Sequence, residues 1–482
     1  MKVCRLCLFA ISISLGLISL TPQLTSALTR PAITNVPTPT IGYVQVEPDA
    51  GSSTPSGMAL LGFSSAGTLV TETGVPASTL TQSGRVFVDV NGTVNTGIVL
   101  ANPGDQDVVV SFYFTDGSGT DFGNGALTLT PKHQIATLLN QEPFNGRATM
   151  FGTFTFSSSA PVSALALRRH TNERGDSIVS TLPLFTEGTS GLGSRVAIPH
   201  FVTQSWYTQL VLVNPTSAPV SGTTEFFDAT SKGDKALKVR INGVLASSVR
   251  YSVPPRSATR LLIDNNSDRA ALDSIHIVPA AGSTAPAGFA TFTYKAGGLS
   301  LSETSVSASR ASSKVHLYIE SSGAFGKADS IETGLTIDNP ARFAATVQLT
   351  ITGMDGVDTG MTASVTIPGG GQIVKLTRAL FPALPSVFQG ILRVTSSAAL
   401  TVNGVRMHYN DRGDLLSTAM PLWDEEIPPG QSDVYFPHVA IDGGFSTRLV
   451  LINPSSPTST GRLWFFSQEG ILLPVGSLVA EN

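Results

Sequence analysis

The sequence predicts an all-β protein made of tandem β-sandwich modules in a linear array. Short apolar runs alternate with clusters of Gly, Asn, Asp and Pro, and almost no segment has the period of a helix. One strand signature that ends in Asn-Pro occurs four times. Residues 43–78 also align without a gap on residues 274–309. The chain is therefore a repeat array that starts partway through a repeat.

The composition is that of a folded protein of several domains. Of its 482 residues, 41% are hydrophobic and 13% are charged, which is enough apolar surface to exclude disorder of the whole chain. The net charge is −4, and no run of Lys or Arg forms a basic patch. We therefore expect no nucleic acid partner.

The first 27 residues have the pattern of a signal peptide. Lys2 and Arg5 precede an apolar run over residues 6–20, and cleavage is expected after Ala27. The apolar run is too short for a bilayer span, so we expect no membrane span after cleavage and a secreted or cell-surface location. Cys4 and Cys7 both lie in this segment, so the mature chain has no cysteine and no disulfide. Residues 28–42 form a leader.

The recurring signature fixes the modules. It reads TGIVLANP, TQLVLVNP, TGLTIDNP and TRLVLINP at residues 96–103, 208–215, 333–340 and 447–454. Each copy alternates inward and outward positions and ends where Pro removes a backbone donor, so a turn must follow. The complete modules continue with a second strand, a strand pair around a proline turn, and a hairpin, as a two-sheet sandwich requires.

These signals divide the chain into two partial and three complete modules. The complete modules cover residues 85–186, 196–308 and 315–423, and the pieces cover residues 43–78 and 433–482. Equivalent histidines, such as His170 and His408, are 238 positions apart, so the duplicated unit is a pair of modules. Residues 244–273 have no counterpart in either piece. Short linkers between the modules predict a string of beads.

The modules resemble the immunoglobulin-like or fibronectin-like sandwiches of bacterial exported proteins. The resemblance covers the chain from residue 43 onward and rests on strand number, strand spacing and the apolar strand that ends in Asn-Pro. It implies display or binding and transfers no catalytic residue.

Two tripeptides and one aromatic pair are candidate binding residues. Arg174-Gly175-Asp176 and Arg412-Gly413-Asp414 resemble the motif that animal matrix proteins present to integrins, although the same residues also make a good β-turn. Trp206-Tyr207 precedes a signature strand and is either a sugar-stacking platform or part of a core.

No metal, cofactor or catalytic residue is predicted. His170 with His408 and His200 with His438 occupy equivalent positions in different modules, so neither pair should meet at one metal. The loop over residues 116–121 resembles a calcium loop but lacks its terminal Glu, which favours a plain hairpin. No serine elbow or particular pair of carboxylates indicates hydrolysis, so we do not expect an enzyme.

The function expected from these features is that of a secreted or cell-surface, non-enzymatic repeat protein with a structural, adhesive, protein-binding or glycan-binding role. Two alternatives remain: accessory modules of an extracellular enzyme whose catalytic domain is absent, or a truncated fragment of a larger surface protein. The terminal half-modules also allow head-to-tail association, in which the C-terminal strands of one molecule pair with the N-terminal strands of another.

Overall fold

A computed structural model describes residues 38–186, 196–202, 205–228, 236–264, 271–308, 310–453 and 458–474. The predicted signal peptide and most of the leader lie outside this part. Residues from Pro37 onward form one compact unit. In the described part the only helix is the four-residue α1 (Thr377–Leu380), and no helix is long and apolar enough to cross a membrane. The all-β class is confirmed.

Each complete module has two groups of four antiparallel strands. In module 1, the group β7-β6-β9-β4 shares β9 with the group β8-β5-β9-β10, because the 23-residue β9 runs through both. The strands are β4 (Thr81–Asn91), β5 (Val94–Ala101), β6 (Val108–Asp116), β7 (Asp121–Leu129), β8 (Gln134–Leu138), β9 (Thr149–Thr171) and β10 (Ser177–Leu182).

Module 3 repeats this plan with the orders β24-β23-β26-β21 and β25-β22-β26-β27. The short β28 is added to β21. Its strands are β21 (Ser312–Ser322), β22 (Ile331–Asp338), β23 (Ala345–Gly353), β24 (Asp358–Ile367), β25 (Gln372–Leu376), β26 (Val387–Tyr409), β27 (Leu415–Met420) and β28 (Trp423–Asp424).

Module 2 has the same two groups, but two strands replace the single long one. The orders are β11-β18-β13-β16 and β17-β12-β19-β20, with the hairpin β14–β15 attached to β17. The strands are β11 (Val196–Val202), β12 (Trp206–Val213), β13 (Val220–Asp228), β14 (Val239–Ile241), β15 (Val244–Ala246), β16 (Ser248–Val253), β17 (Ala258–Asp264), β18 (Ala271–Pro279), β19 (Ala287–Ala296) and β20 (Leu299–Ser307).

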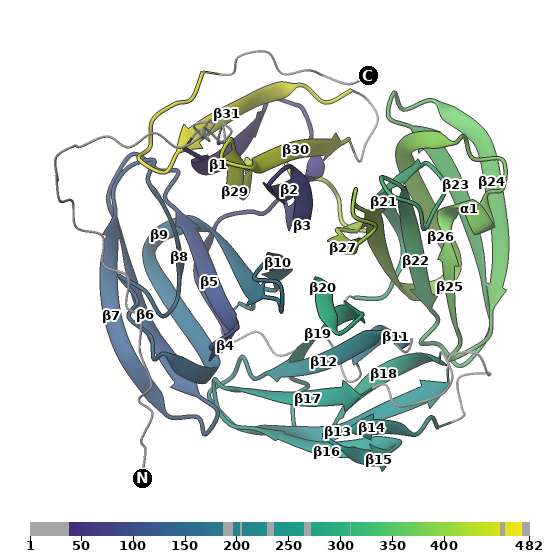
Figure 1. Ribbon diagram of the computed structural model, residues 1–482, viewed down its shortest axis with the longest axis horizontal. Helices are drawn as coiled ribbons and strands as arrows, with labels where there is room; N and C mark the ends of the chain where they lie inside the picture. Colours follow the sequence, from purple (N-terminus) through teal and green to yellow (C-terminus); the bar gives the residue numbers. More distant parts are fainter. Residues whose placement is uncertain are drawn as a thin grey trace, which may run out of the picture. The chain divides into compact units, whose positions relative to one another are not determined.

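The first three and the last three strands of the described chain form the fourth module together, which we call the composite module (Figure 1). Its sheets are β29-β1-β31 and β3-β2-β30. The strands are β1 (Thr40–Pro48), β2 (Ser56–Ser65), β3 (Thr68–Pro76), β29 (Val434–Ile441), β30 (Phe445–Ile452) and β31 (Gly461–Ser467). Ala59 pairs with Leu449 in the register in which Ala290 of module 2 pairs with Leu210. The terminal halves, which the sequence suggested might join different molecules, therefore pair within one chain.

The linear array of beads expected from the sequence is corrected by these contacts. Val211 and Val213 of β12 belong to the hydrophobic core of module 1, and Val450 and Ile452 of β30 belong to that of module 3. The signature strand thus buries apolar side chains on both faces, one face in its own module and the other in its neighbour. The error arose because its second apolar face was interpreted as outward-facing.

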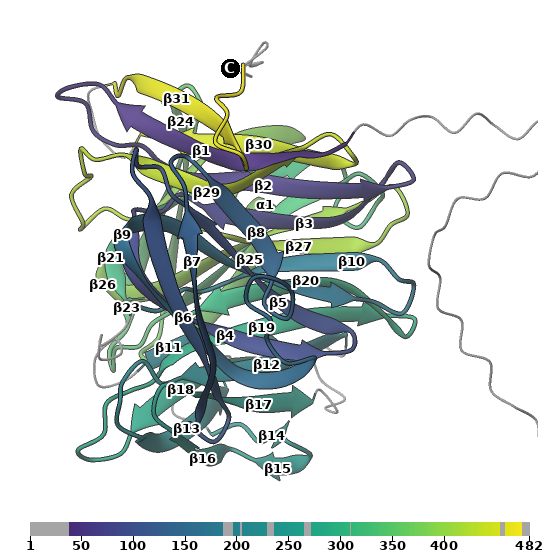
Figure 2. The ribbon, with the colours of Figure 1, turned by 90° about the vertical axis from the view of Figure 1, so that its left-hand side faces the viewer.

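The final hairpin strands of the four modules also contact one another. β10 contacts β3 and β20, and β27 contacts the same two strands. Both ribbon views show these four strands side by side (Figures 1 and 2). Each module therefore contacts two others, and the contacts form a closed cycle.

Candidate functional site: an apolar pocket between modules 2 and 3

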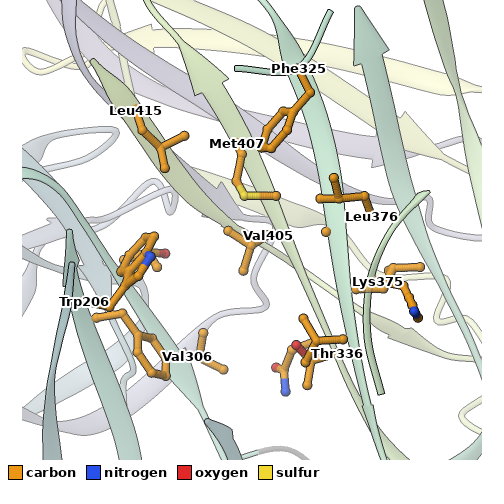
Figure 3. A pocket seen from close by; sticks show the side chains of 15 residues that line it. Trp206, Val306, Phe325, Thr336, Lys375, Leu376, Val405, Met407 and Leu415 are labelled. Atoms are coloured by element: carbon orange, nitrogen blue, oxygen red, sulfur yellow. The ribbon is translucent and has the colours of Figure 1, made fainter. Parts of the chain in front are cut away.

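The candidate site is an apolar pocket of about 350 Å³ between modules 2 and 3. Strands β12, β19 and β20 form one wall, and strands β22, β25, β26 and β27 form the other. The lining residues are Trp206, Phe292, Thr304, Val306, Phe325, Gly334, Leu335, Thr336, Val374, Lys375, Leu376, Asn403, Val405, Met407 and Leu415. Figure 3 shows Trp206 and Val306 on one side of the space, with Thr336 and Leu376 on the opposite side.

Aromatic contacts hold two lining residues in place. The Trp206 ring lies 5.1 Å from the ring of Tyr294, its cross-strand partner in β19. The Phe325 ring stands edge-on to Tyr409 at 5.4 Å. Large apolar rings fixed in this way give a pre-formed wall for a ligand.

Few polar groups face this pocket. Asn403 and Thr336 are cross-strand partners, and the buried Nδ2 of Asn403 has no hydrogen-bond partner. Lys375 is exposed, and Figure 3 shows its amino group turned away from Trp206. The lining is therefore largely apolar, and its uncharged polar side chains are Thr304, Thr336 and Asn403.

At the equivalent interface elsewhere in the chain, buried apolar side chains occupy the place of the pocket. At the contact between the composite module and module 1, Val99 and Leu165 hold the positions of Thr336 and Asn403 and are likewise cross-strand partners. They are 1% and 5% exposed and share a core cluster with Ala59 and Val75 of the composite module. The polar pair has thus replaced an apolar pair at the pocket.

Module 3 also carries an insertion beside the pocket. Between β4 and β5, module 1 has only two residues, 92 and 93, whereas between β21 and β22 module 3 has residues 323–330. Phe325 lies in this longer loop and lines the pocket. Module 3 therefore differs from its duplicate at the loop and at the strand pair that border the same space.

The two Arg-Gly-Asp turns, predicted as candidate adhesion motifs, face each other. Arg174 Nη2 donates to Asp414 Oδ2 at 2.6 Å, and Arg412 Nη2 donates to Asp176 Oδ2 at 3.5 Å. The side chains of Asp414 and Asp176 are only 14% and 16% exposed, respectively. Gly175 and Gly413 both have positive φ, as the turn requires. Recognition of either tripeptide by a receptor requires this pairing to open.

Trp206 and Tyr207 point to opposite sides of β12, because adjacent strand residues alternate. Trp206 lines the pocket, whereas Tyr207 is 44% exposed with the Lys295 ammonium 5.3 Å from its ring. The two rings therefore do not form one stacking platform. Trp206 alone joins the candidate site.

Of the four histidines singled out in the sequence, the three with described side chains, His170, His408 and His438, do not line this pocket. His170 and His408 lie beside Glu303 and Glu72, at 3.7 and 3.6 Å from their carboxylates. Burial lowers the pKa of His438 to about 4, and the side chain of His200 lies outside the described part. The described residues contain no group of three His, Cys, Asp or Glu that could hold a metal ion.

Sequence reasoning missed two buried ionic clusters that join modules. Arg168 of module 1 donates to Asp89 at 3.2 Å and to Glu303 of module 2 at 2.9 Å. In the duplicate, Arg406 of module 3 pairs with Glu320 at 2.8 Å and with Glu72 of the composite module. The repeated Glu72 and Glu303 were visible in the alignment, but a repeated carboxylate does not reveal its partner in another module.

The second cluster holds its carboxylates ionised. Burial alone raises the pKa of Glu72, but Arg406 and His408 outweigh burial and lower it to about 2. Arg406 and Arg448 also outweigh burial at Glu320 and lower its pKa. Each of these two carboxylates pairs with an arginine of another module, so the cluster holds modules together.

No family model and no curated protein sequence matches the chain. Among solved structures, the chain is similar to the crystal structure of the infectious bursal disease virus VP2 subviral particle, at 12% identity and a TM-score of 0.13. That alignment covers 78% of this chain and 81% of the other. The T13 viral particle of the same virus aligns at 11% identity over 78% of this chain and 79% of the other, with a TM-score of 0.12. Similarity at this level supports no conclusion about function.

Proposed function

We propose that this protein is a secreted or cell-surface, non-enzymatic binding protein that takes up a small, largely apolar molecule between modules 2 and 3. The observation that carries the proposal is the replacement of Val99 and Leu165 by Thr336 and Asn403 at equivalent positions, which accompanies the pocket. A structural or adhesive role does not require an apolar pocket of this size between two modules.

The pocket defines the ligand class. Its volume is at the lower end of the range for small-molecule sites, so the ligand is compact. Trp206, Phe325 and Met407 suit a planar or branched hydrocarbon body. The uncharged polar side chains of the lining, Thr304, Thr336 and Asn403, suit a carbonyl, ether or hydroxyl oxygen on that body.

Binding of a naphthalene ketone tests this proposal directly. The fluorescence of 6-propionyl-2-dimethylaminonaphthalene moves to shorter wavelength in apolar sites, and we expect a saturable shift with the full-length protein. In competition, 2-acetylnaphthalene should displace this probe about tenfold better than 2-ethylnaphthalene, because only the ketone can accept a hydrogen bond from the polar side chains of the lining.

The double substitution Thr336→Val and Asn403→Leu restores the residue types of module 1. We expect it to weaken probe binding at least about tenfold while keeping the thermal stability of the protein or raising it. Thr362→Val, on the exposed face of β24, is the matched control and should bind normally. Unchanged probe binding in the double variant rejects this site.

A further inference from the structure

A polar and aromatic cluster lies on the outward face of the sheet β29-β1-β31 in the composite module. Tyr435, Gln45 and Trp464 are cross-strand neighbours and form one row across the three strands. The residues before and after each of them, such as Leu463 and Phe465 around Trp464, belong to the hydrophobic core of the module. Because successive strand residues point to opposite faces, the row points away from that core. Figure 1 shows β31 at the outer margin of the composite module.

Two carboxylates on the same face are held in fixed positions. Trp464 Nε1 donates to Glu47 Oε2 at 2.6 Å, which sets the orientation of the indole ring. Gln45 Nε2 and Tyr435 Oη donate to Asp433 Oδ2 at 2.6 and 3.3 Å. Among the described residues, no donor reaches the second oxygen of either carboxylate, Glu47 Oε1 or Asp433 Oδ1. Each carboxylate thus has one oxygen bound by the protein and one that can accept from a ligand.

The equivalent sheet of module 2 lacks these groups. At the positions of Tyr435, Gln45 and Trp464 it has alanine, histidine and glutamate, and at the position of Glu47 it has valine. These residues of module 2 are Ala197, His276, Glu225 and Val278. Strands β11, β18 and β13 nevertheless pair in the same order and register as β29, β1 and β31. Strand pairing therefore does not require the cluster.

The cluster has the chemistry that recognises a neutral sugar. Trp464 is half-buried, and within the described part of the chain no other ring and no cation lies against it. An aromatic face of this kind can stack on the C–H face of a sugar ring. Hydroxyl groups at the edge of that ring can donate charge-assisted hydrogen bonds to Glu47 Oε1 and Asp433 Oδ1. The same two carboxylates repel an anionic polymer.

We propose that the outward face of β29-β1-β31 binds a neutral polysaccharide, with one sugar ring stacked on Trp464 and its hydroxyls donating to Glu47 and Asp433. Because hydrogen bonds within the protein already fix the indole and both carboxylates, binding orders few side chains. None of these three residues lines the apolar pocket between modules 2 and 3, so the two sites can be tested independently.

Affinity electrophoresis of the full-length protein tests this site. Native gels contain glucomannan, galactomannan, xylan, laminarin or hydroxyethyl cellulose, and we expect at least one of these neutral polymers to retard the protein. Polygalacturonate, an anionic polysaccharide, should not retard it. Trp464→Ala should weaken the binding measured from the retardation at least about tenfold. Tyr207→Ala is the matched control, because it removes an exposed ring from module 2, and it should bind normally.

A second variant preserves the shape of the site. Glu47→Gln together with Asp433→Asn keeps an acceptor for each protein donor, so the melting temperature should stay nearly unchanged while binding weakens about tenfold. The proposal is overturned if no neutral polysaccharide retards the protein, or if polygalacturonate alone does. It is also overturned if both variants bind fully, or if Tyr207→Ala weakens binding as much as Trp464→Ala. Binding of the naphthalene probe to the apolar pocket is a separate measurement, and Trp464→Ala should leave it unchanged.

Discussion

The asparagine of the repeated signature does more than precede a proline. In each complete module it is fully buried, and its Nδ2 donates to three backbone carbonyls; these residues are Asn102, Asn214 and Asn339. One side chain thereby joins the end of the signature strand to the proline turn of the following strand pair. The repeated Asn-Pro thus marks the strand end and a buried hydrogen-bond centre.

Asn214→Ala should therefore be far more damaging than the same change at Asn453, the exposed asparagine of the fourth signature copy. The first change leaves buried carbonyls without donors and should lower the free energy of unfolding by about 3 kcal/mol, and the second by less than about 1 kcal/mol. Urea unfolding of both variants measures the difference. Equal losses would show that the buried hydrogen bonds of Asn214 contribute no more to stability than the exposed side chain of Asn453.

His438 gives the composite module a pH dependence. Its pKa is lowered by burial to about 4 from an ordinary value of 6.5, so the unfolded chain binds a proton that the folded chain does not. Its contribution to stability is complete above pH 6.5 and falls as the pH drops toward 4. We expect His438→Leu to remove this pH dependence, which amounts to about 3 kcal/mol of unfolding free energy between pH 7 and pH 4. Unfolding free energies at pH 7, 5.5 and 4 test this, and an unchanged slope would contradict it.

At the scale of elements, modules are joined by buried charges as well as apolar strand faces. Arg406 lies between Glu320 and Glu72, which come from two modules, and is 3% exposed. Removal of the guanidinium leaves two buried carboxylates of which only one, Glu320, retains an arginine, Arg448. Burying unpaired charge is costly, so this contact is sensitive to single substitutions.

Arg406→Ala should lower the free energy of unfolding by about 3–5 kcal/mol. The control is Arg393→Ala, since Arg393 pairs with Glu425 but has a side chain that is 51% exposed, and its loss should amount to about 1 kcal/mol or less. Chemical denaturation at neutral pH compares the two. Similar losses would mean that the inter-module cluster contributes no more than a surface pair.

How far the sequence predicted this structure depends on whether each signal is local. Strand ends at Asn-Pro, the all-β class and the absence of counterparts for residues 244–273 follow from local pattern and alignment. The identity of the strand or charged group with which each of these pairs does not follow from local pattern. Val211 gives no sign that its neighbour is module 1, and neither Arg174 nor Asp414 indicates the facing turn. The pocket escaped notice because it depends on Asn403 departing from Leu165, a difference visible only once register is known.

At the scale of the whole molecule, strand pairing holds together the two halves of the composite module, which lie far apart in the sequence. The strands of each complete module, in contrast, belong to one continuous stretch of chain. β2 and β30 are separated by nearly the whole chain, yet they pair over eight residues from Ser56 to Phe63. The composite module contacts modules 1 and 3 through apolar side chains from both of its halves. Closure thus couples the ends of the chain to the cores of two other modules.

A disulfide between the paired strands distinguishes closure within one chain from exchange between chains. Ala59 and Leu449 are direct cross-strand partners, so Ala59→Cys with Leu449→Cys brings two thiols within bonding reach. Mild oxidation at any protein concentration should give a disulfide-bonded monomer on a non-reducing gel, because the chain supplies both strands itself. Leu449→Cys alone is the control for chance cross-linking. A ladder of disulfide-linked multimers from the double variant alone would show that these strands pair between molecules, which is the head-to-tail association that the half-modules suggested from sequence.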